Sequence, residues 1–97
     1  MADDPLDQDS ASPFEISREL DLHTFRPRDI ASVVEEYLAE AHERGFQHVR
    51  LIHGKGIGFQ REVVRTILAR TPFVVSFRDD YQGNRGATWA ELKPTQT

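Results

Sequence analysis

The sequence predicts a two-layer α/β sandwich of order β-α-β-α-β-β, with a four-stranded sheet and both helices on one face. Segments with apolar residues at every second position alternate with segments whose apolar residues recur every three or four positions. Strands that alternate with helices favour parallel pairing through right-handed crossovers. The first strand is half polar, which indicates that one face of the sheet is open to solvent.

Six elements follow from these periodicities. Alternation of Leu20 and Leu22 with polar neighbours predicts a strand over 19–25, and a helix over 26–45 follows, with Pro27 suited to its first turn. Also predicted are a strand over 46–53, a helix over 59–71 and two strands over 73–79 and 87–93. We expect the apolar positions to share one core that includes Leu20, Leu22, Val33, Tyr37, Val49, Leu51, Val64, Ile67 and Leu68.

Length and composition allow one small domain. The 97 residues include no cysteine, which excludes disulfides and thiolate metal sites and fits the reducing cytoplasm, where we expect the protein to lie. No apolar run approaches the ~20 residues that span a bilayer, so no membrane partner is expected. Residues 1–14 are acidic and contain two prolines, so we expect a disordered arm there and the folded domain over 15–97.

The net charge of −4 is unevenly distributed, because residues 1–19 carry six acidic side chains and one basic one, which leaves the remainder at +1. This balance is far from that of strongly basic nucleic-acid binders, so overall charge does not decide the function. Basic residues gather in three loops and helix starts: Arg26, Arg28, Lys55, Arg61 and Arg85. Such clustering suits phosphate binding, although arginine is also ordinary at exposed helix starts.

A glycine-rich loop, His-Gly-Lys-Gly-Ile-Gly at 53–58, joins the second strand to the second helix. Its spacing fits neither a Walker A motif nor G-x-G-x-x-G, so no nucleotide cofactor is expected. Gly54, Gly56 and Gly58 permit close approach of the backbone, and N–H groups at a helix start bind anions. Lys55 would add a positive charge. The alternative is a tight turn that needs glycine only for its geometry.

Two histidines, His23 and His53, end the first two strands. Sites gather at the carboxyl ends of parallel strands, and neighbouring strands would bring both histidines to one edge. Asp21 could orient the His23 imidazole or hold a divalent cation such as Mg²⁺ or Mn²⁺. A single histidine there would more often cap or pack, so the pair is the stronger candidate, whereas His42 and His48 are expected to be solvated.

Three motifs resemble the signatures of the Smr (small MutS-related) domain family: Leu-Asp-Leu-His at 20–23, the loop at 53–58, and Gly-Asn-Arg-Gly-Ala-Thr-Trp-Ala-Glu-Leu at 83–92. The resemblance implies a mixed sheet of order 1-2-4-3, similar to the C-terminal domain of bacterial translation initiation factor three. The family includes DNA-nicking endonucleases and domains that cleave or bind RNA, so DNA or RNA is the implied partner. Without the ATPase or repeat segments of other members, the chain resembles a stand-alone bacterial-type Smr protein.

The family's functional residues fall on matching positions, with two departures: Thr24 and Asn84 stand where glycines are common. Asn84 tolerates the left-handed conformation, whereas Thr24 adds bulk beside His23. The resemblance implies catalytic roles for Asp21, His23 and His53. Together with the basic cluster it implies a phosphate-binding set of Gly54, Lys55, Gly56, Gly58, Arg26, Arg28, Arg61, Arg85, Gly86 and Thr88.

Three functions are compatible with the sequence: an endonuclease that nicks DNA or cleaves RNA, a nucleic-acid-binding module without chemistry, and a protein-interaction domain of a repair or ribosome-associated assembly. Cleavage requires His23 or His53, and pure binding requires mainly the arginines. A protein partner would use an exposed apolar patch. Phe25, Ile57 and Phe59 could stack on bases or seal the edge of the core.

Overall fold

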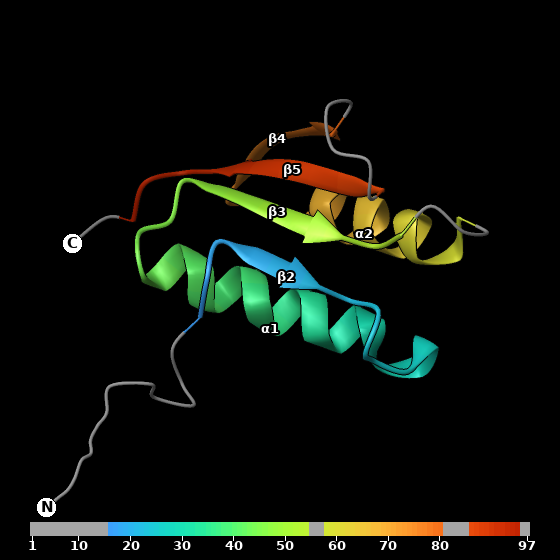
Figure 1. Cartoon of the computed structure of the whole chain (residues 1–97). Coiled ribbons are helices and arrows are strands. Elements are labelled where there is room, and N and C mark those ends of the chain that lie inside the picture. Colours follow the sequence, from blue (N-terminus) through green and yellow to red (C-terminus); the bar gives the residue numbers. More distant parts are fainter. Residues whose placement is uncertain (1–15, 55–57, 81–85, 96–97) are drawn as a thin grey trace, which may run out of the picture.

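The computed structural model describes residues 16–54, 58–80 and 86–95, so the predicted arm lies outside the described residues. The predicted element order is confirmed (Figure 1). Along the chain lie β2 (Glu19–Asp21), η1 (Pro27–Asp29), α1 (Ile30–Glu43), β3 (His48–Ile52), α2 (Phe59–Arg70), β4 (Val74–Asp79) and β5 (Ala87–Leu92). Neither of the two α-helices in the described ranges is long and apolar enough to cross a membrane.

The strands form one mixed sheet of order β2-β3-β5-β4, which confirms the order implied by the resemblance. β2 pairs in parallel with β3, and β5 is antiparallel to both β3 and β4. β4 therefore runs in the same direction as β2 and β3. The carboxyl ends of these three strands meet at one end of the sheet, which we call the carboxyl edge.

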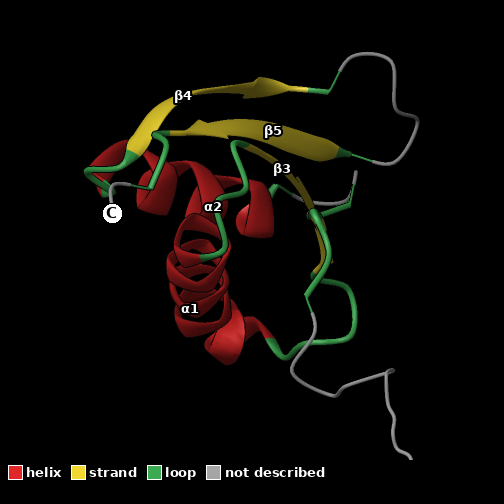
Figure 2. Ribbon diagram, turned by 90° about the vertical axis from the view of Figure 1, so that its left-hand side faces the viewer, coloured by secondary structure: helices red, strands yellow, loops and turns green. Residues whose placement is uncertain are grey.

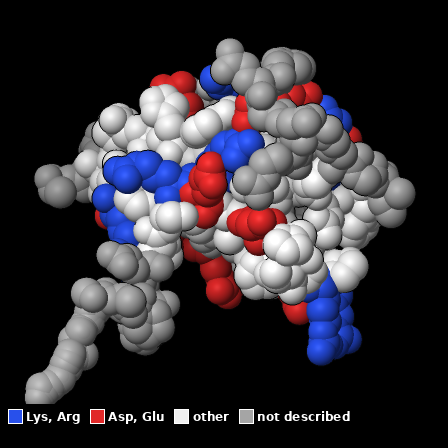
Figure 3. All heavy atoms as spheres, in the orientation of Figure 1, with Lys and Arg blue, Asp and Glu red and all other residues white. Residues whose placement is uncertain are grey.

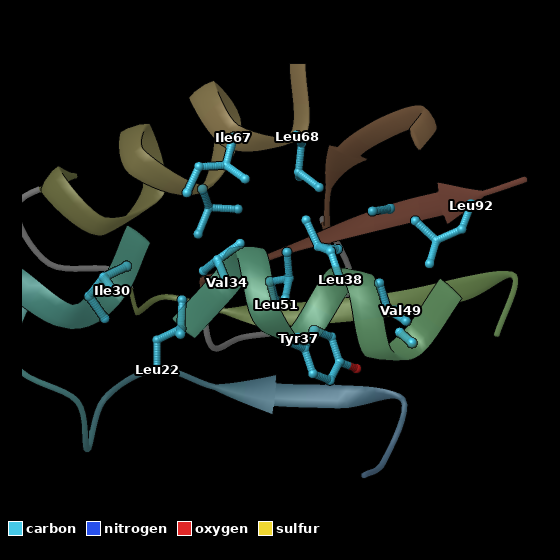
Figure 4. Close-up of a cluster of buried hydrophobic side chains, with 13 residues drawn as sticks. Leu22, Ile30, Val34, Tyr37, Leu38, Val49, Leu51, Ile67, Leu68 and Leu92 are labelled. Carbon is cyan, nitrogen blue, oxygen red and sulfur yellow. The ribbon is translucent and has the colours of Figure 1, made fainter. Parts of the chain in front are cut away.

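Both helices pack on the same face of the sheet, and the other face is open, as the half-polar first strand predicted (Figure 2). Apolar residues at 3,4 spacing line the inner side of each helix and meet the alternate residues of the strands (Figure 4). The predicted core is confirmed, with Leu20 and Val33 partly buried at its margin. Leu51 lies at its centre and is fully buried.

Two boundaries and one histidine differ from the predictions. The first strand ends at Asp21 because the chain turns, with the Phe25 N–H donating to the Leu22 carbonyl at 3.1 Å. The first helix begins with the short 3₁₀ segment η1, and α1 starts only at Ile30. His48 is exposed as expected, but the prediction for His42 was wrong, because its ring is partly buried and stacks on Phe73 at 4.2 Å.

Candidate functional site

Asp21 and His23 form a hydrogen-bonded pair at the end of β2. The parallel ladder aligns Asp21 with Ile52 of β3, and the Leu22 N–H continues it by donating to the Ile52 carbonyl at 2.9 Å. The His23 backbone N–H donates to Asp21 Oδ1 at 3.1 Å, and His23 Nδ1 lies 2.7 Å from the same oxygen. Two contacts to one carboxylate oxygen hold the histidine over the end of its own strand.

The Asp21 contact assigns the tautomer of a neutral His23 ring. A carboxylate can only accept hydrogen bonds, so Nδ1 carries the proton and Nε2 presents its lone pair. The His23 side chain is 75% exposed, which makes the ring accessible from solvent. The pair therefore has the arrangement of a general base with a carboxylate that orients it.

His53, one strand away, is held by protein groups on both ring nitrogens. Its Nδ1 lies 3.0 Å from the Gly54 carbonyl oxygen, and its Nε2 lies 2.9 Å from Thr88 Oγ1. The carbonyl can only accept, so in the neutral ring Nδ1 donates and Nε2 accepts from the Thr88 hydroxyl. Burial has the largest effect on the pKa of His53 and lowers it, although the hydrogen bond to Gly54 acts in the opposite direction. The lowered pKa favours this neutral form.

The structure brings both histidines to the carboxyl edge but gives them different partners on opposite sides of the sheet. Asp21 shares the open face with its register partner Ile52. Thr88 is aligned with the core residue Leu51, so the ring of His53 lies on the helix-covered face. Thr88 is fully buried and its hydroxyl contacts His53, so its implied phosphate contact stays a prediction.

The glycine loop is only partly described, because Lys55, Gly56 and Ile57 lie outside the described residues. Gly54 and Gly58 have φ values of 88° and 84°, which explains glycine at both positions. The Gly54 N–H donates to the Gly86 carbonyl oxygen at 2.8 Å, so this N–H already has a protein partner, and the expected role of Gly54 in a phosphate cradle stays a prediction. Gly58 is the N-cap of α2, and a Cβ added there would meet nothing within 4 Å.

Arg26 and Arg28 are exposed in the connection between β2 and α1. Figure 3 shows basic and acidic side chains interspersed on this face, with a basic group at the lower right, where that connection lies in Figure 1. The two arginines are therefore exposed to solvent, and they follow the Asp21–His23 pair closely in the sequence. Arg85 lies outside the described residues.

Arg61 is less available than its position in the sequence suggested. It forms a bidentate ion pair with Asp79, at 2.7 Å and 3.3 Å, and Arg65 contacts the same carboxylate at 3.2 Å. The hydrogen bond from Arg61 lowers the pKa of Asp79. Sequence reasoning missed Asp79 and Arg65, although Asp79 ends the third parallel strand and so had to reach the carboxyl edge.

A second missed ion pair supports the short strand β2. Arg50 of β3 is 7% exposed, and it contacts Asp80 at 2.6 Å and Glu19 at 3.0 Å. Hydrogen bonding to Asp80 raises the pKa of Arg50, so it stays charged. β2 has only three residues and therefore a short backbone ladder. The ion pair between Arg50 and Glu19 helps to hold this strand, which carries Asp21, against β3.

Within the described ranges, no group of three or more histidine, aspartate and glutamate side chains is placed to hold a metal ion. Oδ1 of Asp21 already receives two contacts from His23. The described residues therefore do not provide a multi-ligand site for Mg²⁺ or Mn²⁺.

Comparison with known proteins identifies the same family as the motifs. The family model described as "Smr domain" matches residues 20–93. Endonuclease MutS2 of Caldicellulosiruptor bescii is 39% identical over 80 residues, which is 80% of this chain and 10% of that protein. Endonuclease MutS2 of Halalkalibacterium halodurans is 38% identical over 91 residues, which is 92% of this chain and 12% of that protein. The chain thus spans about a tenth of the length of these relatives.

Solved structures agree with this assignment. The crystal structure of the Smr domain of Thermus thermophilus MutS2 superposes with a TM-score of 0.72 at 36% identity, over 78% of this chain and 98% of that one. YdaL, a stand-alone small MutS-related protein from Escherichia coli, has the same fold, with a TM-score of 0.73 at 23% identity over 78% of this chain and 64% of that one. By sequence and by fold, this chain belongs to the Smr domain family.

Proposed function

We propose that this chain binds nucleic acid and cleaves its phosphodiester backbone, by nicking DNA or cutting RNA. The observation that carries the proposal is the exposed His23 imidazole with a carboxylate on Nδ1, located at the carboxyl edge of the sheet. The similarity to proteins named endonuclease MutS2 supports the same reaction class. The cytoplasmic location expected from the cysteine-free sequence stays a prediction.

In the proposed reaction, His23 Nε2 accepts a proton from water as the water oxygen attacks phosphorus. A new P–O bond forms, the bond to the bridging sugar oxygen breaks, and the leaving oxygen takes a proton from the imidazolium or from solvent. Asp21, 2.7 Å from Nδ1, stabilises the imidazolium that forms transiently. A positioned general base of this kind typically contributes about 10²–10⁴-fold in rate.

The other site residues have binding or positioning roles in this proposal. Arg26 and Arg28 would contact phosphates on the side of β2, since both are exposed there. Lys55, outside the described residues, stays a proposed phosphate ligand. His53 and Thr88 would position the chain after β3, because both ring nitrogens of His53 already contact protein groups.

The test is a cleavage assay on end-labelled DNA, end-labelled RNA and supercoiled plasmid, each with divalent cations and with a chelator. We expect the wild-type chain to cleave at least one substrate and His23→Ala to lose that activity while keeping its circular dichroism spectrum. His48→Ala is the matched control, because His48 is exposed at the opposite end of β3. A wild-type chain that binds but never cleaves would instead be a binding module without chemistry.

A further inference from the structure

Three large hydrophobic side chains are markedly exposed among the described residues: Phe25 at 37%, Phe59 at 50% and Val75 at 53%. The two phenylalanines follow the strands that end at the candidate site, Phe25 after β2 and Phe59 after β3. Val75 lies near the start of β4, at the other end of the sheet. Neither phenylalanine belongs to the core cluster, so sealing the core does not account for them.

The backbone holds both phenylalanines in defined positions. The Phe25 N–H donates to the Leu22 carbonyl at 3.1 Å, and the following η1 turn is closed by the Asp29 N–H donating to the Arg26 carbonyl at 2.9 Å. Phe59 is the first residue of α2, directly after its N-cap Gly58. Rings on such ordered segments lose little conformational freedom when they bind a flat partner.

In the sequence, arginines lie close to each phenylalanine. Exposed Arg26 and Arg28 follow Phe25 closely, and Arg61, whose side chain is paired with Asp79 and still 38% exposed, lies two residues after Phe59. An extended apolar patch would suit a protein partner, whereas exposed aromatic residues followed in the chain by arginines suit a partner made of bases and phosphates.

We propose that the site takes unpaired nucleotides, with Phe25 and Phe59 each stacking on a base near the phosphate that is cleaved. Bases inside a duplex have their faces covered by neighbouring pairs, so both contacts require a single-stranded or locally unpaired segment. Single-stranded DNA and RNA share this chemistry. The inference rests on the proposed nucleic-acid binding and specifies its substrate class.

The experiment measures fluorescence anisotropy of the full chain with labelled 15-nucleotide oligo-dT, oligo-U and a mixed-sequence duplex of equal length. Phe25→Ala and Phe59→Ala should each weaken single-strand binding by about 5- to 150-fold, the range for the loss of one stacked base. Duplex binding should change less than about twofold. Phe25→Trp should keep single-strand binding close to that of the wild type. Phe25→Leu, which is apolar but has no aromatic face, should lose binding as Phe25→Ala does.

Val75→Ala is the control, because it truncates an exposed apolar residue near the start of β4, at the end of the sheet away from the carboxyl edge, and it should bind like the wild type. Oligonucleotides that contain 2-aminopurine report stacking directly, since its fluorescence should be quenched by the wild type and less by each alanine variant. Unchanged single-strand affinity in both alanine variants, or equal losses on duplex and single strand, would overturn the stacking role. A wild-type chain that binds none of the three probes at low salt would instead refute the proposed function itself.

Discussion

His23 and His53 stand at the ends of neighbouring parallel strands, and their surroundings differ in almost every respect. His23 has a side chain 75% exposed and a carboxylate on one ring nitrogen. His53 is 8% exposed, and protein groups contact both of its ring nitrogens. The role of a histidine at a strand end therefore depends on its exposure and its partners, since proton transfer needs one ring nitrogen that the substrate can reach.

The largest expected effect comes from a crossed comparison of His23→Gln with His53→Gln. His23→Gln should slow cleavage by about 10²–10⁴-fold while the free energy of unfolding changes by less than about 0.5 kcal/mol. His53→Gln should cost about 1–3 kcal/mol of stability, because buried partners lose a matched hydrogen bond. Urea denaturation and single-turnover cleavage on the same preparations measure both quantities. Full activity in a folded His23→Ala/His53→Ala double variant would remove the catalytic interpretation.

Leu51→Ala tests how much the core beneath β3 contributes to the stability of the fold. Leu51 is fully buried and aligned with both Leu20 and Thr88, so the truncation leaves a cavity in the centre of the core. We expect a loss of about 2–5 kcal/mol in the free energy of unfolding. The control is Val75→Ala at an exposed position, which should leave the denaturation midpoint nearly unchanged. An unaltered midpoint and slope in Leu51→Ala would contradict the central place of this residue.

Thr88→Val isolates the hydroxyl that reaches His53. The two side chains have nearly the same shape, so the main change is loss of the donor to Nε2, with an expected cost of about 1–3 kcal/mol. Thr88→Ser keeps the hydroxyl and should recover the wild-type ring titration, followed by proton NMR of His53. If the Thr88→Val and Thr88→Ser variants give the same His53 titration, the Thr88 hydroxyl does not influence the protonation of the His53 ring.

The smallest effect is a pH dependence of stability. Burial lowers the pKa of His53 below its ordinary 6.5, so below that value the unfolded chain binds a proton that the folded chain excludes. The contribution is fully present above pH 6.5 and is lost as pH falls towards the folded pKa. The pKa of Asp79 is lowered from 3.8 by its hydrogen bond to Arg61, so its contribution is lost only at more acidic pH.

Urea denaturation at pH 7, 6 and 5 should show the free energy of unfolding of the wild type decreasing with acidity. In His53→Asn the decrease should be smaller, because no imidazole at that position can gain a proton. An identical decrease in both proteins would assign the pH dependence to other groups.

The periodicity of apolar residues was enough to predict the order of the elements, the single core and the open sheet face. Tyr37, Leu51 and Ile67 are examples, because burial of an apolar side chain follows from its place in a local 3,4 or alternating pattern. The same patterns placed Asp21, His23 and His53 near the ends of the first two strands, although the first strand ends at Asp21, earlier than predicted. Local pattern determines which residues reach the carboxyl edge.

The state of each site residue depends on contacts between distant parts of the chain. His53 meets Thr88 across 35 positions, and Arg61 meets Asp79 across 18, so neither the buried hydroxyl nor the paired arginine could be inferred from local spacing. The Gly54 N–H is likewise occupied by Gly86, which the antiparallel strand β5 brings alongside. Local sequence patterns are enough to place the Asp21–His23 pair and His53 near the carboxyl edge. Which of these groups remain exposed to a substrate depends on the tertiary structure, because hydrogen bonding and burial are set by neighbours in space.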